Sequence, residues 1–213
     1  MSERLRIALT KGRLQEKSVE LFEAAGLDCT PVRSPGRRLI HALPNYPLDV
    51  VLAKAPDVIT YVEHGVCDLG VVGKDTVLEK GGAFYEVLDL GFGRCRFALA
   101  VKKNSSFYRT YKTRRVASKY PNVTRAFFEG KGMDVDIIKI EGSVELAPIL
   151  NLADGIVDIV ETGATLKENG LEPIEDVAQV SARLIVNTAS MKLYKNEITD
   201  FLSRMERELE GEA

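Results

Sequence analysis

The sequence lacks several features that mark common classes of protein. Its 213 residues contain no uninterrupted apolar run near the roughly 18 residues that a membrane-spanning helix needs, so we expect no membrane association. Lys and Arg total 29 against 31 for Asp and Glu, a net charge of -2, so no general basic field exists to hold nucleic acid. The amino-terminal segment shows neither the apolar core nor the cleavage site of a secretory signal, and we therefore expect a cytoplasmic protein.

Cysteine and histidine are too sparse to predict a metal centre or a nucleophile. Cys29, Cys67 and Cys95 share no CxxC spacing, and His41 and His64 are the other residues of this kind in the chain. We expect buried thiols. No Ser or Cys catalytic motif accompanies the two histidines, so we expect both to be structural.

Familiar nucleotide-binding motifs are also missing. The segment 70–75 lacks both the spacing and the Ser or Thr of a P-loop, and the glycines on either side of Phe92 lack the third glycine of a dinucleotide fingerprint. These absences argue against a P-loop ATPase and a dinucleotide-dependent dehydrogenase.

What the sequence does contain is an alternation of strand-length apolar runs with amphipathic stretches. With 45% apolar and 28% charged residues, this pattern is typical of an α/β protein in which helices cover both faces of a mostly parallel sheet. The predicted strands are 5–10, 38–42, 48–53, 68–73, 96–101, 135–140 and 156–160. The predicted helices are 14–25, 57–64, 122–130, 144–150 and 164–169.

Two glycines around Phe92 interrupt the pattern and predict a crossing between two domains. Near the end of the chain, apolar residues at helical spacing behind Asn196, a plausible N-cap, predict an amphipathic helix whose apolar face needs a partner. We therefore predict that the chain returns to its first domain. Lobe I would comprise 1–91 plus 183–213 and lobe II 92–182, with two crossings and a cleft between the lobes.

The most informative segment is an apolar strand that runs directly into residues 161–165, Glu-Thr-Gly-Ala-Thr, with a helix beyond. Gly163 permits close approach of the backbone, and the hydroxyl groups of Thr162 and Thr165 lie beside amide groups that can converge on a phosphate. A carboxylate at Asp158 would accept hydrogen bonds from sugar hydroxyl groups. A plain strand–turn–helix connection has the same pattern, so the segment alone leaves both interpretations open.

Cations gather where strands are predicted to end. Lys11 and Arg13 flank Gly12 at the carboxyl end of the first strand, where open α/β sheets bind ligands. At the start of a helix these charges oppose the helix dipole, and a bound anion would relieve the conflict. Solvated loop residues are the alternative. Further cations follow at Arg33, Arg37, Arg38 and Lys54.

Four segments together resemble the short form of ATP phosphoribosyltransferase over essentially the full chain. Two are short, ALTKGRL at 8–14 and RRLI at 37–40. Two are long: 55–75 contains APDV, YVEHG and DLGVVGKD, and 142–166 contains GSVELAP, LAD and ETGATL. Their order and spacing also fit the family.

The resemblance implies a fold and a reaction. The fold is that of type II periplasmic solute-binding proteins, two α/β lobes around a cleft. In the reaction, N1 of ATP attacks C1 of 5-phosphoribosyl 1-pyrophosphate (PRPP) with inversion and releases pyrophosphate, with Mg²⁺ required. This is the first step of histidine biosynthesis.

The resemblance also implies roles for individual residues. The 5-phosphate would be held by Glu161, Thr162, Gly163, Ala164 and Thr165. The ribose hydroxyl groups would be addressed or supported by Asp154 and Asp158. The pyrophosphate would face Lys11 and one of Arg37 and Arg38, with Gly12 and Arg13 as further candidates on the pyrophosphate or ATP side. Lys54 is a weaker catalytic candidate, because the family usually carries Arg there and Lys offers a point charge in place of a bidentate fork. We expect Mg²⁺ to arrive with the substrate, without a definite protein ligand.

Alternation along the predicted strand 38–42 would turn Arg37 and Arg38 to opposite faces. The sequence does not tell which of the two faces the cleft.

Partners follow from the resemblance as well. Short-form chains act with a regulatory paralogue of histidyl-tRNA synthetase in a hetero-octamer, and a homodimer of catalytic chains is the smaller assembly expected.

Two other functions remain to be compared. A solute-binding or effector-sensing module of the same fold would need an export signal or a DNA-binding helix-turn-helix, and the sequence shows neither. A type I phosphoribosyltransferase normally carries adjacent acids before its loop, whereas Asp158 and Glu161 are separated by two apolar residues.

Overall fold

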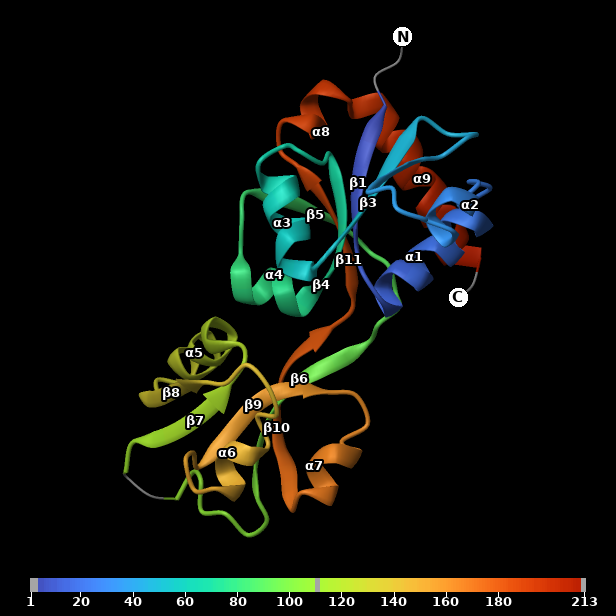
Figure 1. Cartoon of the computed structure of the whole chain (residues 1–213). Helices are drawn as coiled ribbons and strands as arrows, with labels where there is room; N and C mark the ends of the chain where they lie inside the picture. The colour runs from blue at the N-terminus through green and yellow to red at the C-terminus, as the bar shows by residue number, and fades with distance from the viewer. Residues whose placement is uncertain (1–3, 110–111, 212–213) are drawn as a thin grey trace. The chain divides into compact units, whose positions relative to one another are not determined.

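The computed structural model describes residues 4–109 and 112–211, which form two compact α/β units (Figure 1). Unit 1 consists of Met1–Gly93 and Ser181–Ala213, and unit 2 consists of Arg94–Val180. Within the described ranges, no helix combines the length and the apolar character needed to cross a membrane.

The chain changes unit two residues away from the predicted positions at both crossings. Phe92 and Ala182 were expected in the second lobe but belong to unit 1. The amide of Ala182 donates to the carbonyl of Phe92, and the amide of Leu90 donates to the carbonyl of Ala182, both at 2.9 Å. These bonds extend the pairing at the edge of the first sheet, so the second unit starts only at Arg94.

Unit 1 contains a six-stranded mixed sheet. Its strands are β1 (Leu5–Thr10), β2 (Ile40–Ala42), β3 (Leu48–Ala53), β4 (Leu69–Gly73), β5 (Phe84–Asp89) and β11 (Ala182–Asn187). They lie in the order β2-β3-β1-β4-β11-β5. The expectation of a mostly parallel sheet applies to the central strands β3, β1 and β4, whereas β2, β11 and β5 pair in antiparallel fashion.

Helices cover both faces of this sheet. They are α1 (Arg13–Ala24), α2 (Thr30–Arg33), α3 (Ala55–Glu63), α4 (Lys74–Lys80), α8 (Ser190–Leu193) and α9 (Lys195–Gly211). The helices α1 and α9 lie on one side of the sheet and α3 and α4 on the other (Figure 1). The ring of Phe22 on α1 meets the ring of Phe201 on α9 edge to face, with centroids 5.5 Å apart, so the last helix buries its apolar side in unit 1.

The predicted N-cap of the last helix is wrong. Asn196 is the second residue of α9, which begins at Lys195. The chain already turns before this point, and the amide of Ile198 donates to the carbonyl of Tyr194 at 2.9 Å.

Unit 2 contains a five-stranded sheet. Its strands are β6 (Cys95–Lys102), β7 (Arg114–Ser118), β8 (Val135–Lys139), β9 (Gly155–Val160) and β10 (Leu171–Val180), in the order β10-β6-β9-β7-β8. Its helices are α5 (Pro121–Gly130), α6 (Leu146–Ile149) and α7 (Ala164–Glu168). Phe128 on α5 is buried against one face of the sheet, and Leu166 on α7 is buried against the other. The helix predicted over 144–150 is reduced to the single turn of α6.

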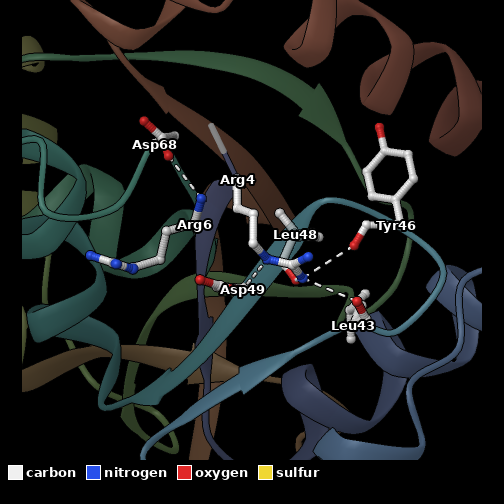
Figure 2. Close-up of polar contacts among 7 residues, drawn as sticks. All are labelled: Arg4, Arg6, Leu43, Tyr46, Leu48, Asp49 and Asp68. Carbon is white, nitrogen blue, oxygen red and sulfur yellow. Dashed lines mark hydrogen bonds and ion pairs between the residues drawn. The ribbon is translucent and has the colours of Figure 1, made fainter. Parts of the chain in front are cut away.

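Arg4 fixes the connection between β2 and β3 (Figure 2). Its guanidinium donates to the carbonyl groups of Leu43 at 3.0 Å, Tyr46 at 3.3 Å and Leu48 at 2.9 Å, and it pairs with Asp49 at 2.7 Å. Because β2 has only three residues and lies at the edge of the sheet, these contacts help to hold this short strand in place.

The three cysteines all lie in the described part of the chain, and no disulfide joins them. Cys29 and Cys67 are buried, and this burial raises the pKa of each thiol to about 11. Cys95 is half-buried, so the prediction of buried thiols is correct for two of the three.

Candidate active site

Lys11 and Lys54 leave neighbouring parallel strands at the same level. Thr10 lies opposite Ala53 in the pairing of β1 with β3, and the amide of Lys11 donates to the carbonyl of Ala53 at 2.9 Å. Both lysine side chains are exposed. Among the residues that the structure describes, neither has a carboxylate partner. Two available positive charges therefore lie at the carboxyl edge of the parallel strands, where ligands of α/β sheets bind.

Gly12 starts α1 beside these lysines. Its φ of 94° and ψ of -144° lie in a region open mainly to glycine, and no side chain caps the helix. The first amide groups of α1 therefore lie at the same edge without an intrahelical acceptor. Arg13 is exposed at the first helical position, and it makes an interaction of its own within the protein.

Arg37 and Arg38 lie in a turn, because β2 begins only at Ile40. Strand alternation therefore does not separate them, and both line one cavity of about 390 Å³. Since β2 is antiparallel to β3, with Ile40 opposite Val51, the chain before Ile40 runs toward the same edge as Lys11 and Lys54. The structure thus offers both arginines on unit 1, where the sequence predicted one.

The predicted phosphate loop of unit 2 lines a cavity of about 310 Å³. Gly163 has a φ of 78°, a left-handed conformation that turns the chain from β9 into α7. The hydroxyl oxygen of Thr162 accepts a hydrogen bond from the amide of Ala164 at 3.3 Å. The side chains of Glu161, Thr162 and Thr165 are exposed. The loop from Glu161 to Thr165 forms the wall of this cavity, as a phosphate-binding turn requires.

Three carboxylates line the same cavity: Asp158 on β9, Glu145 at the start of α6, and Glu161 in the loop itself. Burial raises the pKa of Asp158 above its ordinary value, and the negative charge of Glu145 adds to this effect. A hydrogen bond from the amide of Ile159 at 2.8 Å and the positive charge of Lys119 act in the opposite direction.

Sequence reasoning gave Glu145 no role. It lies within the GSVELAP segment, and only the packing of α6 against β9 brings it to the loop.

The structure does not bring Asp154 to this cavity. Asp154 precedes β9, and the loop follows it, so the six residues of the strand, at about 3.3 Å per residue, separate the two. The carboxylate of Asp154 accepts a hydrogen bond from the amide of Arg115 at 2.8 Å, and its own amide donates to the carbonyl of Arg115 at 2.7 Å. Asp154 therefore joins β9 to β7 away from this cavity, and its expected role beside the ribose stays a prediction.

Within residues 4–109 and 112–211, no three side chains of His, Cys, Asp or Glu are grouped so that they could hold a metal ion. The carboxylates of Asp158, Glu145 and Glu161 line the cavity of unit 2, but they do not form such a group.

Comparison with known proteins identifies the family of the chain that carries these residues. A family model described as ATP phosphoribosyltransferase matches residues 54–207, most of the chain. The chain belongs to the ATP phosphoribosyltransferase family. Proteins of that name from Clostridium kluyveri and Clostridium acetobutylicum are each 58% identical to it, over 203 and 210 residues. The matches cover 95% and 98% of this chain and 93% and 97% of the two relatives.

Solved structures show the same likeness. The ATP phosphoribosyl transferase (HisG:HisZ) complex from Thermotoga maritima contains a chain with a TM-score of 0.81 and 33% identity, over 98% of this chain and 99% of that one. The periplasmic aliphatic sulphonate binding protein SsuA from Escherichia coli has a TM-score of 0.62 at 14% identity, over 98% of this chain and 73% of that one. This second likeness concerns the fold alone, and it confirms the predicted α/β fold of the type II periplasmic-binding-protein class.

ATP phosphoribosyltransferases are pentosyltransferases that carry out the first step of histidine biosynthesis. Membership of this family favours the enzyme over the non-catalytic binding module of the same fold.

Proposed function

We propose that this chain transfers the 5-phosphoribosyl group of PRPP to N1 of ATP, through the residues assigned below. The observation that carries the assignment is the adjacent placement of Lys11 and Lys54 at the ends of β1 and β3. Neither lysine has a carboxylate partner in the described part of the chain. Charges left unpaired in this way suit a polyanionic substrate.

Unit 2 provides for the sugar end of PRPP. The 5-phosphate binds at the cavity that Gly163 and Thr165 line, where amide and hydroxyl groups donate to its oxygens. Asp158 and Glu145 accept hydrogen bonds from the ribose hydroxyl groups.

Unit 1 provides for the leaving group. As the bond between C1 and the diphosphate oxygen breaks, C1 gains oxocarbenium character and negative charge builds on the diphosphate. Lys11 and Lys54, with Arg37 or Arg38, stabilise that charge. The new bond forms between C1 and N1 of ATP, which already carries a lone pair, so no general base is required. Holding two polyanions together against their repulsion is the main task.

Mg²⁺ enters this proposal with the diphosphate, because the described residues offer no cluster of protein ligands. When bound, it supplies charge screening to the phosphate oxygens. The chain's own part is to place Lys11 and Lys54 and the loop of unit 2.

A regulatory partner belongs to the same proposal. The Thermotoga maritima structure is a complex of HisG with HisZ. This chain matches a chain of that complex over nearly the whole length of both. We propose that the chain acts in the cytoplasm with a paralogue of histidyl-tRNA synthetase in a hetero-octamer, and that catalytic chains form a homodimer without it.

The test of the reaction is direct. The purified chain is mixed with ATP, PRPP and Mg²⁺, and the ultraviolet absorbance of N1-(5-phosphoribosyl)-ATP is followed, with and without the paralogue. Product that disappears when either substrate is omitted supports the proposal. No product under either condition would refute it.

A further inference from the structure

The cavity beside β2 contains a buried histidine that the proposed reaction does not use. His41 is the middle residue of β2 and is only 3% exposed, although β2 is an edge strand. It lines the cavity of about 390 Å³ together with Arg37 and Arg38. The remaining lining residues are Pro31, Ser34, Pro35, Gly36 and Ala42.

The charge of this cavity is of one sign. None of the described residues that line it is acidic. In the described part of the chain, neither Arg37 nor Arg38 pairs with a carboxylate, whereas Arg33 on the adjacent α2 pairs with Glu23. The two guanidinium groups therefore remain available to an anion that comes from outside the chain.

The imidazole of His41 also lacks a partner among the described residues. No described residue forms a hydrogen bond to its ring. The ring nitrogens are nevertheless not sealed in protein, because only the Nε atoms of Arg6 and Arg183 are fully buried without a partner among the described residues. His41 lines the cavity, so the cavity is where its ring can meet a ligand. A neutral imidazole has one N–H to donate, and a protonated one has two.

Packing holds this ring in place. His41 lies opposite Val50 of β3, and both are buried. The turn that joins these two strands is fixed by the guanidinium of Arg4 (Figure 2). A donor held in this way loses little conformational freedom when a ligand arrives.

We propose that His41 is a substrate-binding residue of this cavity and that it donates an N–H to a phosphoryl oxygen of a diphosphate group. Arg37 and Arg38 neutralise the charge of the same group. This inference rests on the proposed function, because both of its substrates bring such a group, the 1-diphosphate of PRPP and the phosphate chain of ATP.

The experiment measures binding and product formation side by side. Inorganic diphosphate, PRPP and ATP are titrated by calorimetry into the full chain and into His41→Phe and His41→Gln variants. Phe fills the space without a donor, and Gln restores an N–H. His64→Gln is the matched control, because His64 is exposed at the end of α3 and lines no part of the cavity.

We expect His41→Phe to weaken diphosphate binding by about tenfold, as the loss of a hydrogen bond to a charged group predicts. The His41→Gln variant should stay within about threefold of the natural chain. If the affinity for PRPP falls in parallel and that for ATP does not, the sugar diphosphate is the ligand. If only the affinity for ATP falls in parallel, the nucleotide is the ligand. Unchanged binding of all three by a folded His41→Phe variant would overturn the inference.

A spectroscopic readout avoids any doubt about folding. The chain has 2 histidines, so the ring signals of His41 and His64 can be told apart in nuclear magnetic resonance spectra with the His64→Gln variant. Diphosphate should shift the ring signals of His41 and leave those of His64 in place; absence of a shift at His41 contradicts the proposal. Product formation by the natural chain tests the proposed reaction separately from the role of His41. If the natural chain forms product but the His41 variants bind diphosphate normally, only the role of His41 is refuted.

Discussion

The amide nitrogen of Lys11 lies 2.9 Å from the carbonyl oxygen of Ala53. This one bond ties the end of β1 to the end of β3, so that Lys11 and Lys54 follow the two strands as neighbours. Because the backbone sets their places, little reorganisation is needed when charge develops on a leaving group.

We expect Lys11→Ala to lower kcat by about 10²- to 10³-fold, which corresponds to about 2.7–4 kcal/mol of transition-state stabilisation. The value of KM for PRPP should rise less than kcat falls, because the charge on the leaving group appears mainly in the transition state. Lys54→Ala should have the smaller effect of the two. Steady-state kinetics with both substrates varied measure these changes.

Lys17→Ala provides the control for the Lys11 variant, because Lys17 is exposed on α1 and pairs with Glu20 at 2.6 Å. Its kinetics should match those of the natural chain. A Lys11→Ala enzyme with a raised KM and an unchanged kcat would assign Lys11 to ground-state binding instead.

Gly163→Ala tests the loop of unit 2. A methyl group at this position would meet only the side chain of Val160, at 3.7 Å, so the added atom has room. The φ of 78° nevertheless places an L-residue in the left-handed region, which costs about 1–2 kcal/mol. We expect a loss of this size in the free energy of unfolding in urea and weaker binding of PRPP. Full stability with full affinity would show that the loop relaxes.

Asp158→Asn links stability to pH. Burial raises the pKa of Asp158 in the folded chain, so above that pKa the folded state carries a charged form that it disfavours. Below the ordinary pKa of Asp, both states are protonated and this penalty is absent. The Asn variant should therefore unfold at higher urea concentration than the natural chain near neutral pH, and the advantage should shrink as the pH falls.

The same Asp158→Asn variant should bind PRPP less tightly, since Asn replaces an acceptor for ribose hydroxyl groups with a mixed donor and acceptor. Asp136→Asn, on an exposed position of β8, is the control for both measurements. Greater stability in the control as well would point to a general charge effect in place of the burial of Asp158.

Regulation gives a further prediction. If histidine acts through the paralogue, the purified chain alone should be active and only weakly inhibited by histidine, and strong inhibition should appear when the paralogue is added. Inhibition curves with and without the second chain measure the difference. Potent inhibition of the single chain would contradict the prediction.

Local sequence pattern predicts several strands of this protein in which apolar residues predominate. The bounds of β1 and β3 match the prediction because both strands are central and buried in the sheet. The prediction misses β7 and β11. It also does not predict β5 and β10, whose residues are mostly half-buried or exposed and are interrupted by acids, and by Pro173 in β10. These strands depend on antiparallel neighbours distant in sequence, β11 and β6, which no local pattern reveals.

The site shows the same division. The loop from Glu161 to Thr165 could be predicted because its chemistry lies within one short segment. Asp154 and Asp158 are four residues apart in sequence, yet only Asp158 reaches the cavity, because an extended strand carries Asp154 away from the loop. Glu145 reaches the cavity through tertiary packing alone. For Arg37 and Arg38, the error lay in extending β2 by two residues, which introduced an alternation that a turn does not have.

The strand order of unit 1 has a consequence for biosynthesis of the chain. Within the described sheet, β5 has β11 as its one neighbour, and β11 leaves the ribosome only after all of unit 2. The first unit therefore cannot complete its sheet between β4 and β5 until the whole of unit 2, which is continuous in sequence, has been synthesised. Truncation before β11 would leave exposed strand edges prone to aggregation.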